Sequence, residues 1–187
     1  HPVRGVLRAT ISRPGRPDIR VEQPVDLRPG ESREVQFGPD SFPALAVRDP
    51  DLWWPYTLGS PDLYDLNLEY RTFDRVVDSA HQRFGIRTVQ QFRDGDAGAD
   101  GGDFYLKVNG RELMVRGATY TPDLLFASDP DRETAILRYV KDLGLNMIRL
   151  EGKFPGDHLL QVADELGIPV MYGWMCCNQW EKWQQWD

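Results

Sequence analysis

The hydrophobic pattern of this chain changes its period near Arg116, and this change constrains the fold more than any other feature. Before that point, apolar and polar residues alternate in short segments that Pro and Gly separate. The clearest segment is 63–72, in which every second residue from Tyr64 to Tyr70 is apolar. Such alternation is typical of a half-buried strand. Residues 1–103 are therefore expected to form an antiparallel β-sandwich of short strands.

Further strands are expected in the same half of the chain, at 3–11, 32–37, 76–84 and 86–92. The Gly/Asp-rich segment 94–103 is interpreted as a surface loop. A calcium loop is disfavoured because its carboxylates lack the EF-hand spacing and the closing Glu. Next, Asn109-Gly110 separates the apolar runs 104–108 and 112–115. That arrangement predicts a β-hairpin.

Beyond this hairpin the apolar spacing becomes helical. Asp129 can cap a helix whose first residue is Pro130, and Gly144 follows its last turn. A second helix is expected from Asp157, with Gly167 as its stop signal. The sequence therefore predicts two helices in this half of the chain.

Short apolar strands accompany these helices at 146–150 and 168–171. Strands that alternate with helices through short loops indicate a parallel sheet, either doubly wound or closed into a barrel. A TIM barrel needs eight strands and typically about 250 residues. After the hairpin, the remaining residues up to 187 provide only three such strands and two helices. We therefore expect an incomplete α/β barrel, the opening part of a longer (β/α)₈ unit.

Charge and composition argue against several classes of function. The formal net charge of −7 disfavours a nucleic-acid partner, which usually requires a basic face. No apolar run approaches the roughly 20 residues of a membrane span, so no membrane partner is expected. Residues 1–7 lack a signal-peptide core. No G-x-G-x-x-G motif or P-loop occurs, and the adjacent Cys176 and Cys177 fit neither metal nor disulfide spacing. We expect no cofactor and no metal.

Tryptophan is abundant, with six in the chain. Trp53 and Trp54 are adjacent, and four others lie near the C-terminus, at Trp174, Trp180, Trp183 and Trp186. Indole rings can stack on sugar faces, but they also fill protein cores. For Trp53 and Trp54 we favour the core.

Five segments together resemble glycoside hydrolase family 2. They are 52–64 (L-W-W-P-Y-T-L-G-S-P-D-L-Y), 83–89 (R-F-G-I-R-T-V), 104–117, 143–152 and 163–174. In that family a β-sandwich domain precedes an immunoglobulin-like sandwich, and a catalytic TIM barrel follows. The resemblance implies that 1–103 is an all-β immunoglobulin-like sandwich. It implies that 104–187 is the N-terminal portion of the barrel, truncated after its third strand.

Three shorter segments resemble the exo-β-D-glucosaminidases of this family, which remove glucosamine from chitosan chain ends. These segments are 116–124, 149–153 (R-L-E-G-K) and 173–183. β-Galactosidases carry a His-containing sequence after the second barrel strand, whereas this chain has Glu151-Gly152 there. This difference counts against β-galactosidase and β-glucuronidase. The resemblance implies a carbohydrate substrate and a parent chain that supplies the remaining barrel, and we expect that parent to be secreted.

The expected site lies at the carboxyl ends of the barrel strands, where TIM-barrel active sites occur. Asp123 follows the first strand, Glu151 ends the second and Trp174 follows the third. Two carboxylates there would suit a protonated amino group, because charge-assisted hydrogen bonds are roughly twice as strong as neutral ones. Arg149 resembles the arginine that steadies the nucleophile in this fold. Alternative roles are a loop cap for Asp123 and a structural ion pair for Arg149. Candidate pocket walls are Tyr120, Trp180 and Glu181.

The family resemblance implies a retaining mechanism with two carboxyl groups about 5 Å apart. In the family these groups come from the fourth and seventh barrel strands. We therefore assign no catalytic residue within this chain and expect it to be inactive alone. Two alternatives remain open. One is a β-mannosidase or endo-β-mannosidase type of hydrolase, and the other is a non-catalytic structural or carbohydrate-binding module.

Overall fold

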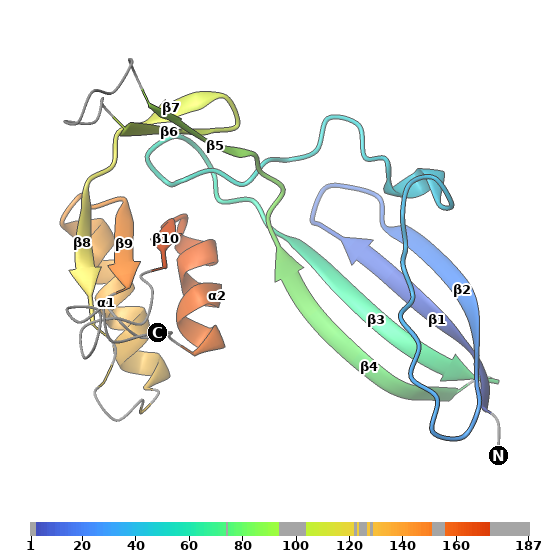
Figure 1. Ribbon diagram of the computed structural model, residues 1–187. Helices are drawn as coiled ribbons and strands as arrows, with labels where there is room; N and C mark the ends of the chain where they lie inside the picture. Colours follow the sequence, from blue (N-terminus) through green and yellow to red (C-terminus); the bar gives the residue numbers. More distant parts are fainter. Residues whose placement is uncertain are drawn as a thin grey trace, which may run out of the picture. The chain divides into compact units, whose positions relative to one another are not determined.

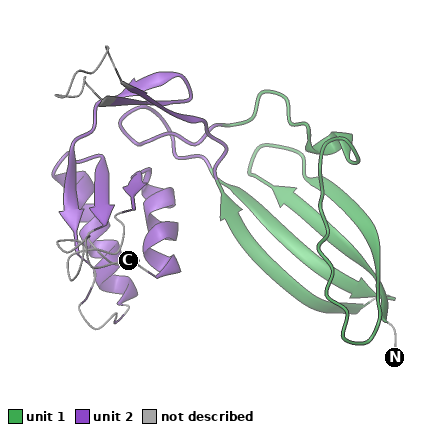
Figure 2. Cartoon of the chain, viewed as in Figure 1, with its two compact units in different colours: residues 1–51, 63–84 green, residues 52–62, 85–187 purple. Residues whose placement is uncertain are grey.

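The computed structural model describes residues 3–73, 75–93, 104–121, 123, 127, 129–150 and 156–172. The chain is mostly β-sheet with few helices (Figure 1). It divides into two compact units (Figure 2). The first comprises His1–Asp51 and Leu63–Phe84, and the second Leu52–Asp62 and Gly85–Asp187. The segment Leu52–Asp62 thus interrupts the first unit in sequence but belongs to the second.

The first unit is built on one antiparallel sheet, in the order β2-β1-β3-β4. Its strands are β1 (Val3–Ser12), β2 (Ile19–Leu27), β3 (Tyr64–Thr72) and β4 (Arg75–Phe84). The strand predicted from the alternation at 63–72 is confirmed as β3, which pairs with β1 and with β4. The buried apolar residues of this sheet are Ala9, Val21, Val25 and Tyr64.

The prediction of a strand at 32–37 is wrong. These residues have no regular structure, and Phe37 instead packs 5.2 Å from Phe42, next to a single 3-10 turn at Pro43–Leu45. Alternating apolar residues supply a face, but a strand also needs a neighbouring strand to bond with. The sequence did not predict β2, because Pro24 interrupts its pattern. Pro is tolerated there because β2 is an edge strand.

The second unit contains a small antiparallel sheet, β5 (Val89–Arg93), β6 (Phe104–Val108) and β7 (Arg111–Leu113). The predicted hairpin is confirmed. Asn109 and Gly110 have φ values of 50° and 79°, which a type I′ turn requires. The strand expected at 86–92 begins later, at Val89, because Ile86 pairs with Leu52 in an isolated bridge.

Three parallel strands follow, in the order β10-β9-β8. They are β8 (Gly117–Tyr120), β9 (Met147–Leu150) and β10 (Val170–Met171), with helices α1 (Pro130–Asp142) and α2 (Asp157–Leu166) between them. Both predicted helices are confirmed. The Asp129 side chain accepts a bond from the Arg132 N–H at 3.0 Å, and Gly167 ends α2 with φ 70°. These are the local start and stop signals that the sequence carries.

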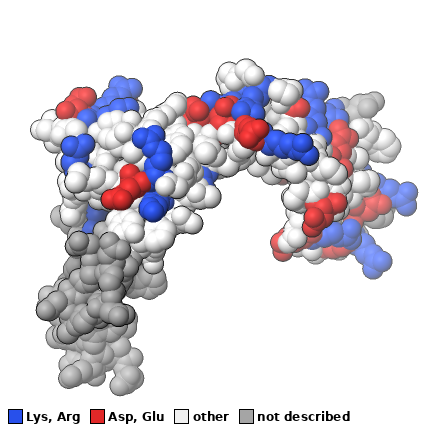
Figure 3. All heavy atoms as spheres, turned by 90° about the horizontal axis from the view of Figure 1, so that it is seen from above, with Lys and Arg blue, Asp and Glu red and all other residues white. Residues whose placement is uncertain are grey.

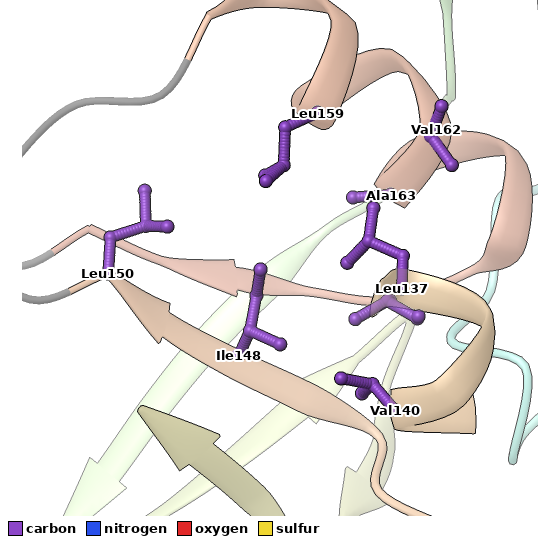
Figure 4. Close-up of a cluster of buried hydrophobic side chains, with 8 residues drawn as sticks. Leu137, Val140, Ile148, Leu150, Leu159, Val162 and Ala163 are labelled. Carbon is purple, nitrogen blue, oxygen red and sulfur yellow. The ribbon is translucent and has the colours of Figure 1, made fainter. Parts of the chain in front are cut away.

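The core of the second unit lies between the helices and the parallel sheet (Figure 4). Helix α1 contributes Leu137 and Val140, and β9 contributes Ile148 and Leu150. The remaining members are Leu159, Val162, Ala163 and Ile168. Since all eight are buried, this cluster fixes which face of β9 the helices cover.

The segment Leu52–Asp62 packs against the end of α2. Trp53 is 2% exposed, and its indole Nε1–H donates to the Asp164 carbonyl at 2.8 Å. The Tyr56 N–H donates to the Gly167 carbonyl at 2.9 Å. The core prediction is therefore confirmed for Trp53, whereas Trp54 is only half-buried.

Charged side chains are interspersed over the described surface. In the view of Figure 3, Lys and Arg lie among Asp and Glu in both units. Some form cross-strand ion pairs, such as Arg8 with Glu22 at 2.6 Å. No helix in the described ranges is long and apolar enough to cross a membrane. Across the same ranges, no group of His, Cys, Asp and Glu has an arrangement that could hold a metal ion.

Candidate functional site

The parallel register of β8, β9 and β10 places three side chains in one row. Thr119 lies beside Arg149, and Arg149 lies beside Met171. Arg149 is exposed, whereas Ile148 and Leu150 on either side of it are buried in the core cluster. Successive side chains of a strand point to opposite faces. Arg149 therefore lies on the face of the sheet opposite to the helices.

Tyr120 lies on the other face from Arg149. It pairs with Leu150 in the register and packs, half-buried, against the core cluster. Burial raises the pKa of the Tyr120 phenol, and the negative charges of Glu133 and Asp123 raise it further. The phenol therefore keeps its proton at neutral pH and can act as a hydrogen-bond donor. The structure brings Tyr120 and Asp123 within electrostatic reach of each other, but it separates Tyr120 from Arg149.

Asp123 follows β8, as expected. Its Oδ1 accepts a hydrogen bond from the Ala127 N–H at 3.4 Å, which closes a local turn. This bond fits the alternative role of a loop cap. A carboxylate offers about four acceptor positions, so the cap bond does not by itself exclude a bond to a ligand. Both roles of Asp123 stay predictions.

Four of the predicted site residues lie outside the described part of the chain. They are Glu151, Trp174, Trp180 and Glu181. The loop at 94–103 and the pair Cys176-Cys177 also lie outside it. Their predicted roles stay predictions.

A cavity of about 370 Å³ lies elsewhere in the second unit. Its lining includes the apolar side chains of Leu106, Val108, Leu113, Met147, Ile168 and Val170. The lining runs from Met147, at the amino end of β9, to Met171 and Tyr172 at the end of β10, and it does not include Tyr120, Asp123 or Arg149. At its border the Arg87 guanidinium lies 4.4 Å from the Trp53 ring centroid and 3.6 Å from Asp164. Sequence reasoning did not single out Arg87, although its segment carries the family resemblance.

Parts of three family-like segments meet where backbones approach closely. A Cβ added to Gly85 would lie 2.6 Å from the Trp53 Cβ. One added to Gly167 would lie 2.8 Å from the Tyr56 nitrogen. Real Cβ atoms do not approach other atoms so closely, so neither position has room for a larger residue. These motif residues therefore serve packing within the second unit.

Comparison with known proteins connects the chain to sugar-cleaving enzymes. The family model for glycosyl hydrolases family 2 matches residues 1–87. The exo-beta-D-glucosaminidase of Streptomyces avermitilis is 40% identical over 157 residues, which is 84% of this chain and 17% of that enzyme. Beta-mannosidase B of Aspergillus flavus is a weaker relative, 28% identical over 144 residues, which is 74% of this chain and 17% of that enzyme.

Solved structures give a similar result. The exo-chitosanase CsxA of Amycolatopsis orientalis matches with a TM-score of 0.76 and 31% identity. The match covers 96% of this chain and 20% of that structure. The chain thus spans about a fifth or less of the length of these three proteins.

Proposed function

Because the chain belongs to glycosyl hydrolases family 2, we propose that it is part of a retaining O-glycosidase that removes glucosamine from chitosan chain ends. The observation that carries this proposal is the 40% identity to an exo-beta-D-glucosaminidase over 84% of the chain. The similarity to an exo-chitosanase structure over 96% of the chain supports the same substrate class. The substrate is therefore a carbohydrate with a free amino group.

The proposed architecture has two parts. The immunoglobulin-like sandwich proposed for residues 1–103 corresponds to the first unit, whereas Leu52–Asp62 and the residues from Gly85 to Arg93 pack with the second unit. Residues 104–187 form the opening strands and helices of a (β/α)₈ barrel. Three parallel strands with α1 and α2 packed on one face support the barrel assignment. The remaining strands come from the rest of the parent chain, which is the main partner of this segment.

The proposed site lies at the carboxyl ends of β8 and β9. Arg149 projects from the sheet face opposite to the helices, which is the inner face in a barrel of this kind. There its guanidinium can orient a carboxylate that the rest of the barrel supplies. Asp123 and Glu151 bind the substrate ammonium group through charge-assisted hydrogen bonds. Trp174, Trp180 and Glu181 are proposed as pocket walls, and Tyr120, which packs on the helix side of β8, is proposed as part of the rim at the end of that strand.

The chemistry requires two further groups. A carboxylic acid protonates the leaving oxygen, and a carboxylate about 5 Å away attacks the anomeric carbon. We place both beyond this chain and assign none of its residues to either role. The 187-residue chain alone is therefore expected to release no glucosamine from chitosan oligomers.

The substrate profile of the full-length parent tests the proposal. Chitosan oligomers are compared with an aryl β-mannoside, for wild type, Glu151→Gln and the charge-matched control Glu112→Gln. Glu112 is exposed on β7, outside the proposed site. Loss of one charge-assisted bond of about 1.5–3 kcal/mol predicts a fall in kcat/KM on chitosan of about ten- to 150-fold. The control is expected to keep wild-type activity.

Two results would change the assignment. Turnover of the mannoside but not of chitosan would favour the β-mannosidase or endo-β-mannosidase alternative, which the likeness to Beta-mannosidase B supports. Turnover of neither, with retained binding to chitosan, would favour a non-catalytic carbohydrate-binding or structural module. The burial of Trp53 already argues against a binding role for that ring.

A further inference from the structure

Asn146 is a buried polar residue with an unusual set of bonds. It directly precedes β9 and is 2% exposed. Its side-chain Oδ1 accepts from the Arg116 N–H at 2.7 Å, and its Nδ2 donates to the Met114 carbonyl at 2.8 Å. The Nδ2 also lies 3.4 Å from the Thr57 hydroxyl. One side chain therefore joins three segments that are distant in sequence.

These bonds extend the parallel ladder by one rung. The backbone N–H of Asn146 donates to the Arg116 carbonyl at 2.7 Å, just before the first pair of the ladder, Gly117 with Met147. The side-chain amide then offers an acceptor and a donor to the chain before β8, as a neighbouring strand would. Each bond uses a backbone group that would be costly to bury unpaired. Asn146 thus fixes how β8 and β9 align.

The alignment of β8 and β9 decides which side chains lie on the sheet face opposite to the helices. With the observed register, Thr119 and Arg149 lie side by side. A slip of one residue in a strand moves its whole set of side chains to the other face. Such a slip would turn Arg149 toward the helices and expose Leu150, which is 0% exposed. Asn146 lies three residues before Arg149, about 10 Å along the strand.

We propose that Asn146 is a positioning residue for the glycosidase site, holding β8 and β9 in the register that presents Arg149 beside Thr119. This inference rests on the proposed function, because Arg149 has a role only if the barrel mouth is the active site. Asn146 itself is buried at the start of β9 and does not touch substrate. Its effect is carried by the strand backbone. A misplacement of about 1 Å in an active site can cost about 100-fold in rate.

The test uses the full-length parent with Asn146→Ala, the isosteric Asn146→Asp and the control Val162→Ala. Val162 is 7% exposed in the core cluster on α2, so its truncation destabilises the same unit without touching the ladder. At a temperature where all variants are folded, we expect Asn146→Ala to lower kcat on the glycoside that the parent cleaves at least about tenfold. Asn146→Asp keeps the acceptor for the Arg116 N–H but places a buried carboxylate oxygen against the Met114 carbonyl, so its kcat should fall at least as far as that of Asn146→Ala. Val162→Ala should stay within twofold of wild type.

Amide hydrogen exchange provides a readout that does not depend on activity. Asn146→Ala and Asn146→Asp should lose protection in both β8 and β9, whereas Val162→Ala should not show this pattern. Unchanged protection in the two strands, or equal activity of Asn146→Ala and Val162→Ala at equal Tm loss, would overturn the inference. If Asn146→Ala does not fold, the Asn146→Asp comparison decides. A wild-type parent that cleaves no glycoside would refute the proposed function, and exchange would still decide whether Asn146 sets the register.

Discussion

Replacing Gly167 by alanine should destabilise the second unit more than the same change at Gly144. Both glycines follow a helix and have left-handed φ values, 70° and 72°. A Cβ at Gly144 would meet nothing within 4 Å. A Cβ at Gly167 would lie 2.8 Å from the Tyr56 nitrogen and 3.0 Å from the Trp54 carbonyl oxygen. The pair therefore separates backbone strain, which both share, from close packing against Leu52–Asp62, which only Gly167 has.

The expected magnitudes follow from these contacts. The left-handed conformation costs an alanine about 1 kcal/mol at either position. At Gly167 the segment must also move away, which breaks the 2.9 Å bond from the Tyr56 N–H to the Gly167 carbonyl. Loss of such a bond between partly buried groups costs about 1–3 kcal/mol. We expect Gly144→Ala to cost about 1 kcal/mol and Gly167→Ala about 3 kcal/mol.

Urea unfolding followed by tryptophan fluorescence measures the difference, because Trp53 and Trp54 lie in the segment that moves. With a slope of about 2 kcal/mol per molar urea, the midpoint of Gly167→Ala should lie about 1 M below that of Gly144→Ala. Equal midpoints for the two variants would refute the reasoning. They would mean that Leu52–Asp62 does not pack on the end of α2 in solution.

Further predictions concern single side chains. The Arg16 guanidinium, bonded to Asp51, lowers the pKa of that carboxyl from 3.8 to about 2. The carboxylate therefore stabilises the folded state fully above about pH 4, and this contribution is lost as the pH falls toward 2. Asp51→Asn should make the urea midpoint less dependent on pH over this range. Trp53→Phe removes the indole donor to the part-buried Asp164 carbonyl and leaves a gap at a buried position, so it should cost about 2 kcal/mol in thermal unfolding, against less than about 1 kcal/mol for the half-buried Trp54→Phe. Leu159→Ala, at a fully buried position, should cost about 2–5 kcal/mol in urea unfolding.

Local signals predicted the helices and the hairpin. These signals act within a few residues, so neighbouring residues in the sequence are enough to predict them. They are the Asp129 cap, the glycines after α1 and α2, and the Asn109-Gly110 turn. The error at 32–37 has the opposite cause. A strand exists only where another strand offers its edge, and no local pattern reports that partner.

The candidate site was only partly predictable. Alternation along β9 is visible in the sequence and places Arg149 opposite to Ile148 and Leu150. Asn146 was missed because its partners lie 30 to 89 residues away along the chain. The only sequence signal for Asn146 is an amide side chain directly before a buried strand. Such a position normally selects an apolar side chain unless backbone groups need a partner.

The close-packed residues of the family-like segments and the residues proposed to select a substrate have different roles. Trp53, Gly85 and Gly167 meet where backbones approach too closely for any larger side chain, so a shared packing requirement is enough to explain their likeness to other family members. That requirement is the same for any sugar. In the proposed site, discrimination between a glucosaminide and a mannoside is assigned to the carboxyl ends of the strands, near Asp123. Substitutions at the close-packed positions should therefore change stability and leave the relative preference for the two sugars unchanged.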